Sequence, residues 1–204
     1  MNHTSKKIKQ IMTEFKDFTD GTRVLFLINR SKEGADGRRN RKIEKLISSN
    51  TEEFEFCLSK LFDLKYRYPE LPLRIYSTVN KRSMDKSIRK LKELQLENDY
   101  QDRVQYYSFY KDMKNRWISS LMRNGSRDET QFIIDIDNTD EEYAIDIQDE
   151  ILKHTELIKK YKTKNGYHLI VKPFNPNLIR TYTKDGHICS DVSIKVDDLI
   201  LLDY

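Results

Sequence analysis

The chain has 204 residues, of which 34% are charged and 37% hydrophobic, and its formal net charge is +4 at pH 7. No apolar run approaches the roughly 20 residues of a membrane-spanning helix, and the N-terminal MNHTSKKIKQ lacks the apolar region of a secretory signal, so we expect a cytoplasmic protein with no membrane contact. Cys57 and Cys189 form no C-x-x-C pair, which argues against a built-in zinc module.

The first half of the chain alternates helical and strand patterns. Apolar residues at helical spacing predict helices over residues 3–20, from Thr51 up to Tyr68, and onward from Ser83. Two β-prone apolar runs, at residues 24–28 and 73–79, predict strands of one sheet. This alternation is typical of a domain that combines helices with a sheet.

Two basic segments lie beside these strands. Residues 29–45, NRSKEGADGRRNRKIEK, predict either a solvated loop that leads to a helix or a contact with a nucleic-acid backbone through Arg38, Arg39 and Arg41. Lys81 and Arg82 follow the second strand at the start of a helix, where a phosphate contact and an ordinary turn are both reasonable. The candidate nucleic-acid-binding residues are therefore these five.

Residues 100–123 predict one long helix that is rich in aromatic residues. Exposed aromatic rings between lysines and arginines could stack on bases. However, several of the aromatic residues fall on one face of the predicted helix together with apolar residues, which favours packing in the core. This face comprises Val104, Tyr107, Tyr110, Lys114, Trp117 and Leu121.

The segment QFIIDIDN, residues 131–138, joins a predicted buried strand to two carboxylates. Asp135 and Asp137 are two residues apart, so in an extended strand both side chains lie on one face, about 7 Å apart at the Cα atoms. Two like charges so placed favour a divalent cation between them, and Mg²⁺ or Mn²⁺ prefers such oxygen ligands. The alternative is that one aspartate caps a helix that begins near residues 140–142 while the other is solvated.

A β-hairpin is predicted next, after an acidic helix over residues 140–154. Residues 156–162 and 167–172 are β-like runs separated by Thr-Lys-Asn-Gly, and Asn-Gly is a strong hairpin signal. His168 lies just after this turn, close to Lys164 and Gly166. A strand histidine is commonly structural, but a nearby lysine and a glycine that permits close approach favour phosphate binding.

FIIDIDN followed by KTKNGYHLIVKPFN resembles motifs I and II of the archaeo-eukaryotic primase superfamily, which includes primase small subunits and PrimPol enzymes. Asp135 and Asp137 match motif I, and Lys164, Gly166 and His168 match motif II. Motif III, a later aspartate, matches Asp191 less closely, with Asp197 and Asp198 as competitors. Similar short chains occur in bacteriophages.

The resemblance implies an α/β (α+β) primase-polymerase fold with a mixed central sheet flanked by helices. It implies one domain over residues 1–204, with an N-terminal lobe at 1–99 and a second lobe at 100–204. It implies nucleotidyl transfer with Mg²⁺ or Mn²⁺ on the aspartates Asp135, Asp137 and Asp191. His168, Lys164, Gly166 and Lys172 would then bind the nucleoside triphosphate.

Three functions remain open at this point. The first is template-dependent nucleotidyl transfer, in the host cytoplasm if the protein is phage-encoded, together with a replication or host partner protein. The second is a catalytically inactive primase-like factor that binds nucleic acid or protein. The third is a metal-dependent nuclease, because paired carboxylates also serve phosphodiester hydrolysis.

Overall fold

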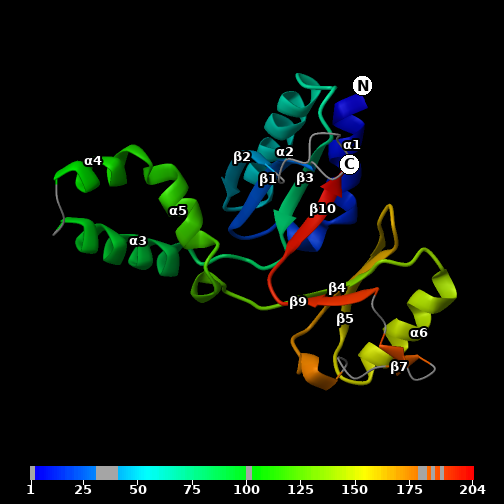
Figure 1. Cartoon of the computed structure of the whole chain (residues 1–204). Helices are drawn as coiled ribbons and strands as arrows, with labels where there is room; N and C mark the ends of the chain where they lie inside the picture. The colour runs from blue at the N-terminus through cyan, green and yellow to red at the C-terminus, as the bar shows by residue number, and fades with distance from the viewer. Residues whose placement is uncertain (1–2, 31–40, 100–102, 179–182, 185–186, 189–190) are drawn as a thin grey trace. The chain divides into compact units, whose positions relative to one another are not determined.

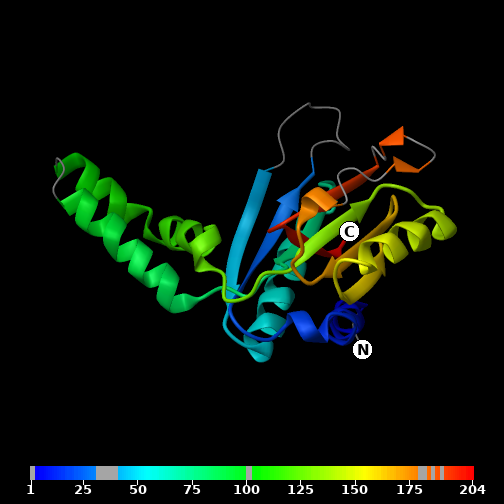
Figure 2. The same cartoon turned by 90° about the horizontal axis from the view of Figure 1, so that it is seen from below.

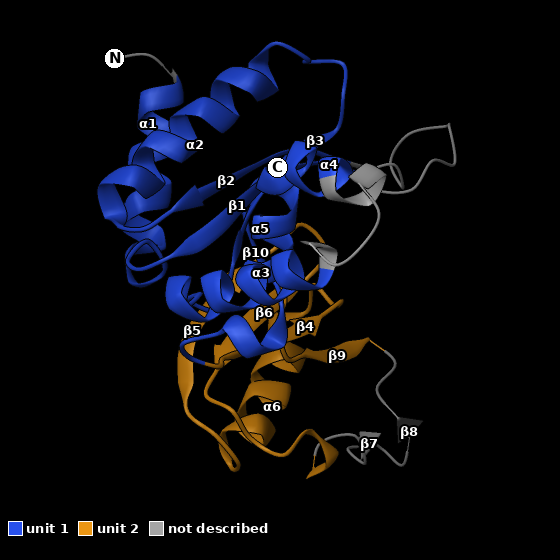
Figure 3. Cartoon of the chain, turned by 90° about the vertical axis from the view of Figure 1, so that its left-hand side faces the viewer, with its two compact units in different colours: residues 1–129, 199–204 blue, residues 130–198 orange. Residues whose placement is uncertain are grey.

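The computed structural model describes residues 3–30, 41–99, 103–178, 183–184, 187–188 and 191–204. Figure 3 shows its two compact units, of which the first comprises residues 1–129 with 199–204 and the second comprises residues 130–198. The expected lobe boundary at 99/100 therefore differs from the boundary between the units. No helix in the described part of the chain has the length and apolar character needed to cross a bilayer.

Unit 1 contains a four-stranded antiparallel sheet in the order β10-β3-β1-β2. The strands are β1 (Arg23–Asn29), β2 (Arg41–Ser48), β3 (Leu73–Thr78) and β10 (Leu199–Asp203). The central β1 is almost wholly apolar because both of its faces are covered. The C-terminal strand β10 completes the edge beside β3 (Figure 1).

Helices cover both faces of this sheet. The helices α1 (His3–Glu14) and α2 (Thr51–Tyr66) pack together, and α2 lies against the strands on one face (Figure 1). Asn50 caps α2 by accepting a hydrogen bond from the Glu53 N–H. On the other face, Val24 and Phe26 pack against Ile118 and Leu121 of α5.

Three helices follow β3, which are α3 (Met84–Asp99), α4 (Arg103–Lys111) and α5 (Met113–Leu121). Both α4 and α5 contact α3, and Figure 2 shows the three in green. Short 3-10 turns complete the unit at Lys16–Phe18 (η1) and Asn124–Ser126 (η3).

Two predictions for unit 1 require correction. The region expected to be a loop leading to a helix contains strand β2, which pairs antiparallel with β1 and packs Ile47 against the cluster that contains Phe26. The long helix predicted over 100–123 is divided at Asp112, and among its described side chains Phe109 is buried. Tyr107 is 72% exposed, so it does not belong to a core stripe.

Unit 2 contains a second antiparallel sheet, in the order β5-β6-β4-β9. Its strands are β4 (Phe132–Ile136), β5 (Leu157–Lys162), β6 (Tyr167–Val171) and β9 (Val192–Lys195). A two-stranded ribbon of β7 (Thr183–Lys184) and β8 (His187–Ile188) and a 3-10 turn, η4 (Pro176–Leu178), lie between β6 and β9 in sequence.

One face of the second sheet carries the apolar core of unit 2. Helix α6 (Glu141–Leu152) packs there through Ala144, Ile147 and Ile151, which contact alternate residues of β4 and β6. Because strand side chains alternate, residues 133 and 135 of β4 lie on the opposite face.

The predicted α+β class is confirmed. The described strands form two four-stranded antiparallel sheets and the β7–β8 ribbon instead of one mixed sheet. The hairpin predicted from Asn-Gly is also present, as β5 and β6.

Candidate functional site

A row of polar side chains crosses the sheet of unit 2 on the face opposite α6. The strand register pairs Tyr161 of β5 with His168 of β6, His168 with Asp135 of β4, and Asp135 with Ser193 of β9. Cross-strand neighbours in such a row are about 5 Å apart at Cβ, so their side chains contact one another directly. The D-x-D strand and the G-x-H hairpin are therefore adjacent, although more than thirty residues separate Asp135 from His168 in sequence.

The Asp135 carboxylate is held by two donors. Its Oδ1 atom lies 2.9 Å from Nε2 of His168, and its Oδ2 atom lies 2.6 Å from Nζ of Lys195. Burial alone would raise the pKa of Asp135, but the hydrogen bonds from His168 and Lys195 outweigh this effect and lower the pKa to about 2. Asp135 is therefore an anion at neutral pH, even though its side chain is only 16% exposed.

His168 is fixed through both ring nitrogens. The Tyr161 hydroxyl lies 2.7 Å from Nδ1, and the two rings meet edge to face with centroids 5.1 Å apart. An ionised carboxylate can only accept, so Nε2 carries the hydrogen that faces Asp135. In the neutral imidazole, Nδ1 then accepts from Tyr161.

Lys195 is shared between two carboxylates. Besides Asp135, its ammonium group lies 3.3 Å from Oδ2 of Asp198, three residues later. Burial lowers the pKa of Lys195, but the two carboxylates more than compensate, so the pKa is raised overall. The ammonium remains charged and partly exposed to solvent.

Gly166 lets the hairpin turn approach the end of β4. A Cβ atom at Gly166 would lie 1.8 Å from the Ile136 carbonyl oxygen and within 3 Å of the Asn138 backbone. Any side chain is therefore excluded, and the turn, closed by the Thr163 N–H donating to the Gly166 carbonyl, contacts the backbone on both sides of Asp137.

Asp137 and Asp191 are neighbours through their backbones. The Asp137 N–H donates to the Asp191 carbonyl at 2.8 Å, which extends the ladder between β4 and β9. Strand alternation places the exposed Asp137 side chain on the same face as Asp135. The Asp191 carboxylate instead accepts from the Tyr143 hydroxyl of α6 at 2.9 Å and lies 3.5 Å from the Asn138 amide nitrogen.

Neither aspartate of the pair caps the next helix. The N-cap of α6 is Asp140, whose Oδ1 atom accepts from the Glu142 N–H at 3.0 Å. Capping therefore does not account for Asp135 or Asp137.

The two carboxylates of this face, Asp135 and Asp137, are of the ligand type that a divalent cation prefers, and both oxygens of Asp135 are engaged within the protein. Asp135 is ionised and already carries a cation, the Lys195 ammonium, on one oxygen. Carboxylate oxygens are the ligands that Mg²⁺ and Mn²⁺ prefer. The third predicted ligand, Asp191, does not join them in this structure, and the described residues include no cluster of three or more His, Cys, Asp or Glu side chains placed to hold a metal.

The predicted nucleotide-binding lysines are in different places. Lys164 is exposed in the hairpin turn, near the end of β4 that carries Asp137. Lys172 follows the other end of β6, and its ammonium pairs with Glu156 at 2.6 Å. Strand geometry separates Lys172 from His168 by about 13 Å, so only Lys164 lies at the same end of the hairpin as Gly166.

The predicted nucleic-acid contacts belong to unit 1. Arg38 and Arg39 lie outside the described residues, as does the side chain of Arg41, the first residue of β2. Lys81 lies 3.4 Å from the Asp20 carboxylate.

Arg82 requires correction as a predicted nucleic-acid contact. The residue is only 1% exposed, and its guanidinium donates to the Leu121 carbonyl. Burial in the interior of unit 1 keeps this guanidinium away from a phosphate at the surface.

Sequence reasoning missed Tyr161 and Lys195. Tyr161 carries a usable signal, because a hairpin with a four-residue loop places it directly opposite His168. Lys195 carries none that we can identify, since its position depends on the pairing of β9 with β4, about 60 residues apart in sequence.

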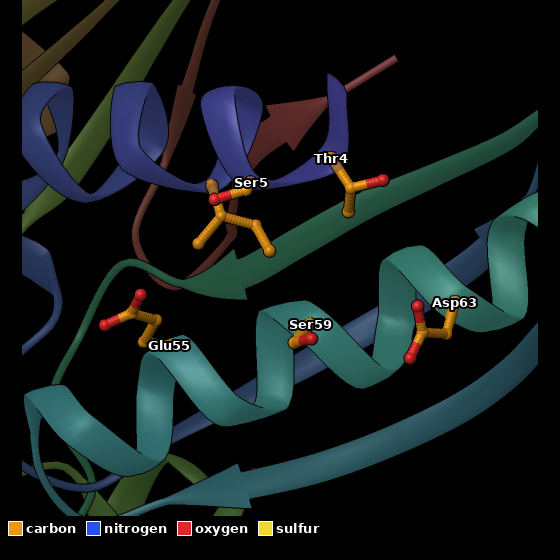
Figure 4. A pocket seen from close by; sticks show the side chains of 6 residues that line it. Thr4, Ser5, Glu55, Ser59 and Asp63 are labelled. Atoms are coloured by element: carbon orange, nitrogen blue, oxygen red, sulfur yellow. The ribbon is translucent and has the colours of Figure 1, made fainter. Parts of the chain in front are cut away.

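Unit 1 also contains a surface hollow of about 320 Å³ between α1 and α2 (Figure 4). It is lined by Thr4, Ser5, Ile8, Glu55, Ser59 and Asp63. This lining includes two carboxylates and no basic side chain, which is unsuited to a phosphate ligand.

Comparison of the chain with protein-family models, with characterised proteins and with solved structures finds no match.

Proposed function

We propose that unit 2 carries a metal-dependent nucleotidyl-transfer site of primase-polymerase type, which uses nucleoside triphosphates and a nucleic-acid template. One observation carries the proposal: Asp135 lies directly opposite His168, with 2.9 Å between Oδ1 and Nε2. The resemblance to the primase superfamily implies that D-x-D and G-x-H act together, and adjacent strands supply this arrangement. The contact of Gly166 with the end of β4 supports the same pairing.

Each residue has a distinct role in this proposal. Asp135 and Asp137 would hold Mg²⁺ or Mn²⁺, and the ion supplies charge neutralisation at the attacking hydroxyl and at the leaving pyrophosphate. His168, oriented by Tyr161, donates its Nε2–H to Asp135 in the metal-free protein and would exchange this hydrogen bond for one to a phosphate oxygen when the nucleotide binds. Lys164 provides a second positive group from the exposed turn.

Asp191 enters this site only if its carboxylate leaves Tyr143. The proposal therefore assigns two carboxylates to the metal in the structure described here, with Asp191 as a third after rearrangement. We propose that the phosphates of the nucleic-acid template bind four basic residues of unit 1, which are Arg38, Arg39, Arg41 and Lys81.

The direct test is Mn²⁺- or Mg²⁺-dependent incorporation of labelled nucleotides on a primed and an unprimed template. Asp135→Asn and Asp137→Asn should each lower the rate by about 10³-fold or more, because electrostatic stabilisation supplies most of the rate in phosphoryl transfer. Asp149→Asn, which changes an exposed carboxylate of α6, is the matched control and should retain the wild-type rate. Unchanged incorporation in either site variant would refute the assignment, and strand degradation without nucleotides would indicate a nuclease.

A catalytically inactive binding protein of the same fold is the second candidate. It is favoured by the engagement of both Asp135 oxygens within the protein and by the hydrogen bonds of the Asp191 carboxylate to Tyr143 and Asn138. Its signature is nucleic-acid or protein binding that does not change when metal and nucleotide are added. Binding that requires both would favour the enzyme.

A further inference from the structure

The Lys195 ammonium occupies the carboxylate oxygen that a metal ion would need. Nζ of Lys195 lies 2.6 Å from Oδ2 of Asp135, which is ordinary charge-assisted hydrogen-bond distance. A bound Mg²⁺ would lie about 2.1 Å from a carboxylate oxygen. Two cations that close to one oxygen would repel each other strongly, so the ammonium and the metal exclude one another there.

Asp198 offers the ammonium a second position. Its Oδ2 atom already lies 3.3 Å from Nζ of Lys195. The four-carbon stem of lysine is flexible, and the Lys195 side chain is 39% exposed, so the ammonium can move toward Asp198 without unpacking the sheet.

The other donor on Asp135 is less able to move. His168 is held by Tyr161 on its second nitrogen, and its side chain is 15% exposed. Of the two partners of Asp135, Lys195 is therefore the one that can leave.

We propose that Lys195 is an internal counter-cation, which holds Asp135 in the metal-free protein, moves to Asp198 when a divalent ion binds, and thereby sets the metal affinity of the site. This inference rests on the proposed function, because it takes Asp135 to be a metal ligand. It assigns Lys195 and Asp198 as positioning residues that do not touch the metal. It also gives Asp198 a role different from that of a third metal carboxylate.

The test measures Mn²⁺ binding to the full chain by calorimetry and by the EPR signal of free Mn²⁺, without nucleotide. Lys195→Met removes the competitor and should tighten Mn²⁺ binding by roughly tenfold or more. Lys195→Arg retains the charge and should bind Mn²⁺ far more weakly than Lys195→Met. Lys159→Met, which removes one positive charge from β5 in the same sheet, is the matched control and should change the affinity less than about twofold.

Asp198 supplies the second arm of the test. Asp198→Asn removes the alternative position and should weaken Mn²⁺ binding by roughly threefold or more, because the ammonium is then retained on Asp135. In the Lys195→Met background, the same substitution should have no effect. An effect of Asp198→Asn that persists without Lys195 would make Asp198 a metal ligand and would overturn the proposal.

The remaining outcomes separate this inference from the proposed function. Equal Mn²⁺ affinity in the wild type and Lys195→Met, with binding abolished by Asp135→Asn, overturns the role of Lys195 and leaves the metal site intact. Failure of both the wild type and Lys195→Met to bind Mn²⁺ overturns the metal site and this inference together. Far-ultraviolet circular dichroism and thermal denaturation of each variant establish that the chain is folded in every comparison.

Discussion

Asp135 should make the stability of the metal-free protein depend on pH in the acid range. The pKa of Asp135 is lowered from 3.8 to about 2 in the folded chain, through His168 and Lys195 and against the effect of burial. Because the folded value lies below the unfolded one, this contribution to stability is present above pH 4 and is lost as the pH falls toward about 2. At 1.36 kcal/mol per pKa unit, it amounts to about 2 kcal/mol.

Urea denaturation in the presence of a chelator measures this contribution. The free energy of unfolding of the wild type and of Asp135→Asn should be compared between about pH 6 and about pH 2.5, so that the titration of groups that do not contact Asp135 cancels. The difference in the free energy of unfolding between the wild type and Asp135→Asn should become smaller by more than about 1 kcal/mol as the pH falls. In the Lys195→Met background this difference should change less with pH, since one of the two donors to Asp135 is missing. A difference that stays constant with pH would show that Asp135 is not held as the structure describes.

Three further predictions concern neighbouring contacts. Gly166→Ala places a Cβ atom against the Ile136 carbonyl and should lower the free energy of unfolding, measured by urea denaturation, by about 2 kcal/mol or more. Gly125→Ala, whose added Cβ meets no atom within 4 Å, should lower it by less than about 1 kcal/mol. Equal losses of stability would contradict the close approach of Gly166 to the end of β4. Tyr143→Phe should cost about 1 kcal/mol in the wild type and less when Asp191 is already Asn, and additive losses in this double-mutant cycle would exclude their hydrogen bond. His168→Ala should raise the nucleotide concentration needed for half-maximal incorporation while Mn²⁺ binding persists; loss of Mn²⁺ binding would give His168 a different role.

Strand β4 and the hairpin β5–β6 could be predicted because their signals are local. An apolar β-prone run identifies β4, and Asn-Gly between two β-like runs identifies the turn. The hairpin also fixes which residues lie opposite each other, so the neighbourhood of His168 follows from the loop length.

The contacts that decide the chemistry of Asp135 and Asp191 are not local. Lys195 reaches Asp135 through a strand pairing between distant segments, and no short motif encodes the register of that pairing. The Asp191 carboxylate accepts a hydrogen bond from Tyr143. The position of an aspartate in a sequence motif does not show which neighbour its side chain contacts. Strand β2 escaped prediction because its apolar residues, Ile43, Leu46 and Ile47, recur at helical and not at alternate spacing, and its pairing with β1 is what makes the segment a strand.

A crystal structure of the full chain grown with Mn²⁺, with the metal located by its anomalous scattering, would show whether Asp135 and Asp137 bind a divalent ion. We expect a Mn²⁺ peak bound by the carboxylates of Asp135 and Asp137, with the Lys195 ammonium moved to Asp198. The absence of such a peak, with Lys195 still bonded to Asp135 at saturating Mn²⁺, would contradict this expectation.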